Sequence, residues 1–207
     1  MPENPSPDFL TRLLNDLLAM SPWEGLAVAA AVAYLVFAIR QNRWCWPAAI
    51  LSSAIFFVLM LQASLPMQAL LQLFYIGMAV YGWWHWSKGG EGGGEAPVVR
   101  WPLARHVLLL AIIATTGLLF GWAWGQQGEA AWPILDSLVA CGAVAATWMV
   151  ARKVLENWLY WLVIDAISAF LYFHQGLALT GLLFLCYLVF ATLGYFSWRK
   201  SWLESHA

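Results

Sequence analysis

Seven stretches of the chain are almost entirely apolar, and short polar segments separate them. Each stretch has 17 to 21 residues, enough for a helix to cross the roughly 30 Å hydrocarbon core of a membrane. The pattern therefore predicts an all-α integral membrane protein with seven transmembrane helices. The expected spans cover residues 23–40, 46–62, 67–86, 106–124, 132–150, 157–173 and 178–198.

The composition argues against a soluble helical bundle. Hydrophobic residues make up 62% of the chain, charged residues make up 10%, and the mean hydropathy is +0.69. Soluble domains carry about 25% charged residues. Seven such stretches would leave a soluble protein with almost no polar surface.

The sequence repeats itself at an offset of 112 positions. Residues 143–198 align on residues 31–86 without a gap, and 16 of the 56 aligned pairs are identical. An apolar composition produces chance Leu and Ala matches, but not matched Arg, Trp, Tyr and Gly residues at one offset. Each copy is long enough for three spans, and such repeats are common in transporters. The identical pairs include Arg40/Arg152, Trp46/Trp158, Tyr75/Tyr187, Gly82/Gly194 and Trp86/Trp198.

Basic residues fall almost entirely in the loops of one side, and Arg12 is the exception. Since Lys and Arg accumulate in cytoplasmic loops, the N-terminus should lie outside and the C-terminus in the cytoplasm. The nine residues on the cytoplasmic side are Arg40, Arg43, Lys88, Arg100, Arg105, Arg152, Lys153, Arg199 and Lys200.

The repeat and the orientation together predict a 3+1+3 order of spans. Three spans alone would leave the second copy inverted, and the span at 106–124 restores the orientation of the first copy. The copies are then parallel and related by a pseudo-two-fold axis along the membrane normal. The predicted units are an amphipathic outer-surface segment at 1–20, three-helix repeats at 21–86 and 131–198, a cytoplasmic linker and linking helix at 87–130, and a cytoplasmic tail at 199–207.

Asp165 is the most unusual polar residue, because it lies about 12 Å into the span at 157–173, near the midplane. An acid at that depth costs at least about 2.5–3.5 kcal/mol. No Lys or Arg lies near the midplane of a predicted span to pair with it. We expect it to face a cation or a hydroxyl-bearing ligand, or else to be a neutral carboxyl bonded to a neighbouring helix. Its repeat mate is Ser53, so the two halves should contribute unequally to a site.

Trp158 and Trp161 share the helical face of Asp165, at spacings of three and four residues. Indole rings attract cations, so a flat aromatic cation would suit this face. Trp is also enriched at membrane interfaces, and the chain has 15 of them. Trp158, close to the cytoplasmic boundary, fits an interfacial belt equally well.

The third span carries a second polar stripe of Gln68, Gln72 and Tyr75. A buried amide in lipid needs a hydrogen-bond partner, and a ligand can be that partner. For Gln72 the alternative is a hydrogen bond to a neighbouring helix. The candidate substrate-binding residues are Gln68, Gln72, Tyr75, Trp158, Trp161, Asp165 and Tyr187, the last being the repeat mate of Tyr75.

Two other classes of protein fit the sequence less well. Asp136 and Asp165 are the only aspartates in the spans and start from opposite sides, and no GxSx, GxGD or HExxH motif occurs, which disfavours an intramembrane enzyme. A non-transporting receptor subunit is the other alternative. The three cysteines have neither CxxC spacing nor a His partner, so no metal, disulfide or cofactor is expected.

Two stretches resemble the PnuC family of vitamin transporters. Residues 71–86 (LQLFYIGMAVYGWWHW) resemble the third span of that family, residues 156–202 resemble its C-terminal region, and the likeness extends over about 20–202. The resemblance implies a seven-helix fold related to the SWEET sugar transporters, and a trimeric assembly. By motif position it places Gln72, Trp158, Trp161 and Asp165 at the site.

The resemblance implies facilitated uptake of nicotinamide riboside across the bacterial inner membrane, with trapping by a cytoplasmic kinase. Relatives carry thiamine, riboflavin or deoxynucleosides. Nicotinamide riboside joins a pyridinium to a diol, so an indole can stack on the cation while Asp165 or Gln72 hydrogen-bonds the diol or the carboxamide. Thiamine is also an aromatic cation, so these residues do not separate the two vitamins.

Overall fold

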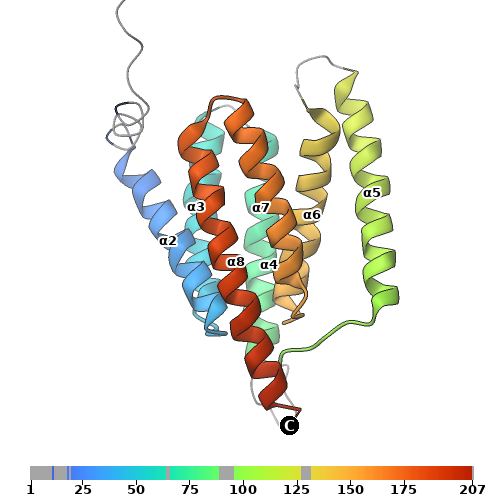
Figure 1. Cartoon of the computed structure of the whole chain (residues 1–207). Helices are drawn as coiled ribbons and strands as arrows, with labels where there is room; N and C mark the ends of the chain where they lie inside the picture. The colour runs from blue at the N-terminus through green and yellow to red at the C-terminus, as the bar shows by residue number, and fades with distance from the viewer. Residues whose placement is uncertain are drawn as a thin grey trace, which may run out of the picture.

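The computed structural model describes residues 11, 18, 20–63, 66–88, 96–126 and 132–206, so most of the predicted segment at 1–20 lies outside the described residues. Within the described part the chain forms seven long helices (Figure 1). Their ends lie within three residues of the predicted spans, except that the last helix continues six residues further. The helices are α2 (Pro22–Ile39), α3 (Cys45–Gln62), α4 (Pro66–Lys88), α5 (Leu103–Gly125), α6 (Pro133–Ala151), α7 (Asn157–His174) and α8 (Ala178–Glu204).

Six of these helices form a closed ring. Neighbours around the ring are α2 and α3, α3 and α4, α4 and α6, α6 and α7, α7 and α8, and finally α8 and α2. Helix α5 stands outside the ring and packs on α6 (Figure 1). The even-numbered helices run toward the end of the bundle that carries the C-terminus, and α3, α5 and α7 run back.

The helix boundaries follow the sequence repeat. Helices α3 and α7 begin and end at residues that differ by 112, and α4 and α8 begin at residues that differ by 112. The loops before α3 and α7 turn at matched residues, Gln41 and Lys153, whose φ angles are 57° and 50°. Both residues adopt the left-handed conformation, which is uncommon outside glycine. The two halves therefore fold in the same way.

Five of the helices are long and apolar enough to cross a membrane by length and composition: α2, α3, α5, α6 and α8. Helices α4 and α7 do not meet that apolarity. Both are long enough, but α4 carries Gln68 and Gln72 and α7 carries Asn157 and Asp165. The two helices that fall short in apolarity are thus the ones that carry most of the predicted site.

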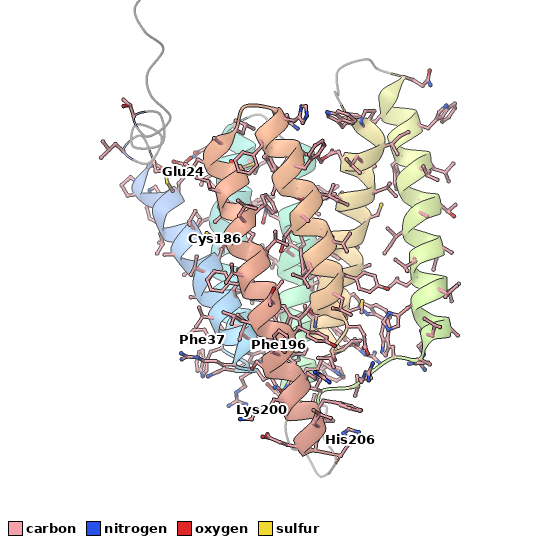
Figure 2. All side chains as sticks on the ribbon, viewed as in Figure 1. Glu24, Phe37, Cys186, Phe196, Lys200 and His206 are labelled. Carbon is pink, nitrogen blue, oxygen red and sulfur yellow. The ribbon has the colours of Figure 1, made fainter. Side chains whose placement is uncertain are left out.

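The nine basic residues predicted to share one side lie at one end of the bundle, which we call the basic end. They occupy the loop before α3, the loop before α7, the approach to α5 and the last turns of α4 and α8. Figure 2 shows Lys200 and His206 at this end and Glu24 near the other. One of the nine, Lys153, is buried, with its Nζ 4.6 Å from the centre of the Trp86 ring.

Four tryptophans join the two halves near the basic end, and we call them the tryptophan cluster: Trp46, Trp86, Trp158 and Trp198. All four are at most 2% exposed. Trp46 meets Trp86 edge to face, and Trp158 meets Trp198 in the same way, with ring centres 5.4 Å apart in both pairs. Trp86 and Trp198 meet each other at 5.8 Å, which closes the row.

Hydrogen bonds from this cluster cross between the halves. The indole nitrogen of Trp86 donates to the carbonyl oxygen of Val150 on α6 at 3.2 Å. That of Trp198 donates to the carbonyl oxygen of Ala38 on α2 at 2.9 Å. The two acceptors are themselves repeat mates, so each half caps the first helix of the other.

Two matched glycines make room for the cluster. A side chain at Gly82 would collide with the Trp46 ring, and a Cβ at Gly194 would lie 2.6 Å from the Trp158 ring. These two glycines thus allow close packing of an indole ring against α4 and α8.

Candidate functional site

The centre of the candidate site is Asp165, the ninth of the 18 residues of α7. Asp165 and Ser168, one turn further, are each 3% exposed. Among the residues that the structure describes, none donates a hydrogen bond to the Asp165 carboxylate or forms an ion pair with it. A buried carboxylate without such a partner is costly at the middle of a membrane helix and calls for a ligand.

Aromatic side chains from α7 and α8 surround this position. Tyr187 of α8 lies within electrostatic range of Asp165. Its ring meets Phe184 edge to face at 5.6 Å, and Phe184 stacks on Tyr172 of α7 at 5.2 Å. The structure therefore brings together two of the predicted residues, Asp165 and Tyr187, beside a row of flat rings.

In the first half, the buried Ser53 stands at the position that matches Asp165, and Tyr75 at the position that matches Tyr187. Tyr75 of α4, half-buried, lies within electrostatic range of Tyr34 of α2. Tyr34 in turn contacts the Trp46 ring, with ring centres 6.0 Å apart. Gln72 is half-buried one turn before Tyr75, and Gln68, a further turn away, is exposed. Tyr75 and Gln72 thus belong to the inner part of the bundle and Gln68 to its rim.

The two predicted tryptophans of α7 lie toward the basic end. Trp158 is a member of the tryptophan cluster, and its buried indole N–H has no hydrogen-bond partner within the described residues. Trp161 is half-buried and packs against the core that this cluster forms. Trp158 is therefore a core residue of the closed end, whereas Trp161 lies between that end and Asp165 along the helix.

Sequence reasoning missed a segment that closes the basic end. Residues 96–101, which we call the strap, lead from α4 to α5. Ala96 and Val98 are buried, and Val98 belongs to the same core as the tryptophan cluster. Val99 pairs with Val154 as an isolated parallel bridge, donating to the Lys153 carbonyl oxygen at 2.9 Å and accepting from the Leu155 N–H at 2.8 Å.

An ion pair completes the attachment of the strap. Arg100 Nε lies 2.8 Å from Glu156 Oε1, and this hydrogen bond raises the pKa of the Arg100 guanidinium. The guanidinium also lies over the ring of Trp202 on α8, 5.2 Å from its centre. The only hint in the sequence was the change from the Gly-rich run to APVVRW, in which valines and an arginine replace the flexible residues.

The comparisons with known proteins agree with this architecture. Residues 21–200 match the model of a family described as nicotinamide mononucleotide transporter. The riboflavin/roseoflavin transporter RibM of Streptomyces davaonensis is 27% identical over 177 residues, which cover 83% of this chain and 80% of the relative. The nicotinamide riboside transporter PnuC of Escherichia coli is 29% identical over 172 residues, covering 71% and 70%.

A solved structure shares the fold. The crystal structure of the vitamin B3 transporter PnuC superposes with a TM-score of 0.68, covering 95% of this chain and 91% of the other, at 18% sequence identity.

We predict that Asp165→Asn raises thermal stability. The substitution removes an unpaired buried charge and keeps the shape, and about 1 kcal/mol gained would raise the melting temperature of a protein this size by roughly 2–4 °C. Thermal unfolding of the purified variant in detergent measures this change in melting temperature. The control is Glu204→Gln, because Glu204 is exposed at the end of α8, so this variant should gain nothing. A lower melting temperature for Asp165→Asn would indicate a neutral carboxyl with a structural hydrogen bond.

Proposed function

Because the chain belongs to the nicotinamide mononucleotide transporter family, whose members are membrane transporters and not enzymes, we propose that it carries nicotinamide riboside across the bacterial inner membrane. The observation that carries this proposal is the buried Asp165 without a protein partner, beside Tyr187 and the stacked rings of Tyr172 and Phe184. The riboside supplies what that place lacks, since it has a positive ring that can stack and hydroxyl groups that can donate to a carboxylate.

The same carboxylate discriminates among related compounds. A mononucleotide would bring a phosphate of about −1.5 to −2 charges near Asp165, and like charges in a poorly solvated place repel strongly. Riboflavin is the second candidate, because RibM matches a larger share of the chain than PnuC does. The neutral ring system of riboflavin can stack, but it leaves the negative charge of the Asp165 carboxylate uncompensated. Thiamine, an aromatic cation, satisfies the charge but lacks the diol.

We assign the substrate site to the middle of the ring of helices. Asp165 and Tyr187 bind from the second half, and Tyr75 and Gln72 from the first. Trp161 stacks at the edge nearer the basic end. Gln68 lies at the rim, where the substrate enters the site, and Trp158, in the tryptophan cluster, closes the opposite end of the site.

The architecture that we propose is two parallel three-helix repeats joined by α5, in a SWEET-like 3+1+3 order. The matched ends of α3 and α7, the matched left-handed loop residues and the reciprocal bonds of Trp86 and Trp198 support it. All seven helices then cross the membrane, α4 and α7 being less apolar because they line the path.

We propose facilitated diffusion, since the ion pairs of the described residues, formed by Glu156 with Arg100 and His106 and by Lys200 with Glu204, lie at the basic end rather than in the middle of the bundle, and the sequence has no GxxxxGK[ST] motif for ATP. Net uptake then needs a separate cytoplasmic kinase that phosphorylates the riboside. By the family resemblance, the assembly is a trimer.

Purified protein in proteoliposomes should take up radiolabelled nicotinamide riboside until the inside and outside concentrations are equal, because no energy source is coupled. Unlabelled riboside should compete more strongly than riboflavin, thiamine or the mononucleotide. Uptake of riboflavin alone would transfer the proposal to the second candidate. Accumulation above equality that a protonophore abolishes would make Asp165 a proton carrier.

We predict that Asp165→Ala weakens binding of the riboside about tenfold or more, because a hydrogen bond to a charged group contributes roughly 1.5–3 kcal/mol. Trp161→Ala should also weaken binding, through lost stacking. Trp23→Ala is the control, since Trp23 is exposed at the start of α2. Calorimetry on purified protein measures all three, and unchanged affinity in both site variants would leave Asp165 and Trp161 as packing residues.

We place the basic end in the cytoplasm, on the distribution of Lys and Arg. A single cysteine introduced at Pro97, which is exposed in the strap, should then react with a membrane-impermeant maleimide only in opened cells. Reaction in intact cells would reverse the orientation.

A further inference from the structure

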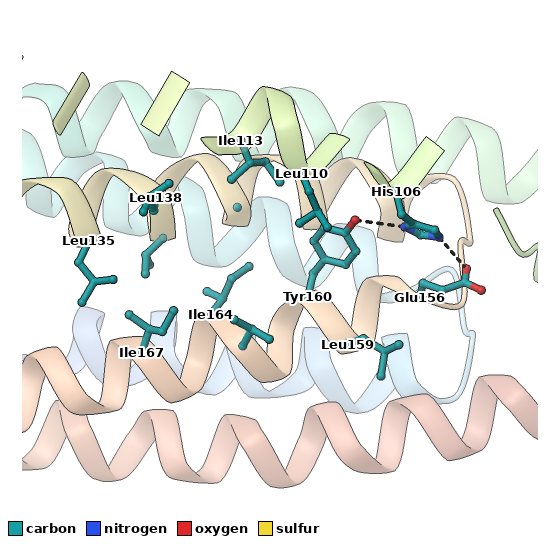
Figure 3. Close-up of a pocket in the computed structure, with 13 residues that line it drawn as sticks. His106, Leu110, Ile113, Leu135, Leu138, Glu156, Leu159, Tyr160, Ile164 and Ile167 are labelled. Carbon is teal, nitrogen blue, oxygen red and sulfur yellow. Dashed lines mark hydrogen bonds and ion pairs between the residues drawn. The ribbon is translucent and has the colours of Figure 1, made fainter. Parts of the chain in front are cut away.

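Helix α5 touches the bundle tightly over one half of its length only. Gly117, Gly121 and Gly125, spaced by four residues, face α6, and a Cβ at Gly121 would lie 2.5 Å from the Ile134 backbone. Toward its N-terminal end α5 diverges from α6 and α7 (Figure 1). The divergence leaves a crevice of about 440 Å³ between the three helices, which Figure 3 shows in close-up.

The walls of the crevice are aliphatic and open to the membrane. They include Leu110 and Ile113 of α5, Leu138 of α6, and Leu159, Val163 and Ile167 of α7. Leu110 is 53% exposed and Val163 60% exposed, although both line the crevice. Hydrocarbon from the bilayer therefore has direct access, and an unfilled crevice would forfeit dispersion contacts along its whole length.

One end of the crevice, at the basic end of the bundle, is polar. His106 Nδ1 lies 3.1 Å from the Tyr160 hydroxyl. The other ring nitrogen, Nε2, is buried, has no hydrogen bond within the described residues, and stands 3.9 Å from Glu156 Oε2, too far for one. Figure 3 shows the three side chains in a row at this end. A buried ring nitrogen without a partner marks a place where a ligand oxygen would be stabilised.

The charges around this end favour an anionic group just outside it. The Glu156 carboxylate is held by Arg100 at 2.8 Å and by the Trp101 N–H at 3.3 Å. Arg105, adjacent to His106, is exposed, and its guanidinium lies 6.0 Å from the centre of the Trp101 ring. Arg105 is thus available to a phosphate, while Arg100 offsets the repulsion from Glu156.

We propose that the crevice binds one glycerophospholipid of the surrounding bilayer. One acyl chain lies between α5 and α7, an ester oxygen satisfies His106 Nε2, and the phosphate pairs with Arg105. The crevice is open along one side toward the bilayer, so hydrocarbon can enter it laterally. A single extended hydrocarbon chain is narrow enough to do so.

Filling the crevice with protein tests the proposal. Native mass spectrometry on protein purified in mild detergent should show one phospholipid retained per protomer. Leu110→Trp should lower that retention at least fivefold, because the indole occupies the place of the chain. Leu108→Trp is the matched control: Leu108 is another leucine of α5, 63% exposed, that does not line the crevice, and its variant should retain the lipid.

Variants at a second wall and at the polar end of the crevice test the proposal independently of Leu110→Trp. Val163→Phe, from α7, should act like Leu110→Trp if the latter does not fold. Phosphatidylethanolamine and phosphatidylglycerol, each added to delipidated protein, should raise the melting temperature of the unaltered chain and of Leu108→Trp, and Arg105→Gln should weaken that response. Equal lipid retention in both crevice variants and the control, or a lipid-free oligomer in which a second copy covers the crevice, would overturn the proposal.

Discussion

The structure depends on one reciprocal contact between the two halves of the bundle. In each half, a tryptophan indole N–H donates a hydrogen bond to a carbonyl oxygen in the last turn of the first helix of the other half. A carbonyl oxygen has two lone pairs, and the oxygens of Ala38 and Val150 each use one of them on a loop N–H, that of Gln41 or Lys153, which leaves the second lone pairs free. Trp198 and Trp86 satisfy them across the interface between the halves. Because the two bonds are symmetry mates, the ring of six helices closes only when both halves are present. The glycines at 82 and 194 follow from this row of indoles. A side chain at either position would collide with the ring of Trp46 or Trp158.

The symmetric frame carries an asymmetric centre. The matched tryptophans, Trp46 with Trp158 and Trp86 with Trp198, sit near the basic end, where the halves lock together. The residues that differ, Ser53 against Asp165, lie near the middle of α3 and α7. A duplicated scaffold needs matched packing to close, but an asymmetric substrate is bound better by unequal groups. The residues that pack the two halves together and the residues proposed to bind the substrate therefore lie on different turns of the same helices. This separation keeps Asp165 away from the closely packed core.

Much of the fold could be predicted from the sequence because a bilayer leaves few options. Apolar length determines where helices lie, and the 112-residue offset determined which helices correspond. The depth of Asp165 also followed from helix geometry, and the structure brings Tyr187 near it. The role of Trp158 could not be predicted, since an interfacial belt, a stacking site and an interior cluster all use the same residue at the same depth. The strap could not be found either. Its attachment depends on Arg100 meeting Glu156, 56 residues away, and no local pattern encodes that pairing.

Helix α7 joins the three features that the bundle contains. Near its start Trp158 is locked in the tryptophan cluster, near its middle Asp165 faces the proposed site, and on its back Val163 and Ile167 line the crevice under α5. Close-packed interfaces transmit a displacement, whereas a hydrocarbon chain can rearrange around one. A shift of α7 that opens the proposed site must therefore disturb the indole row and the strap at the basic end, whereas the aliphatic crevice on its back has no packed protein contact to break. We therefore expect the barrier to movement of the substrate to lie at the tryptophans rather than at Asp165.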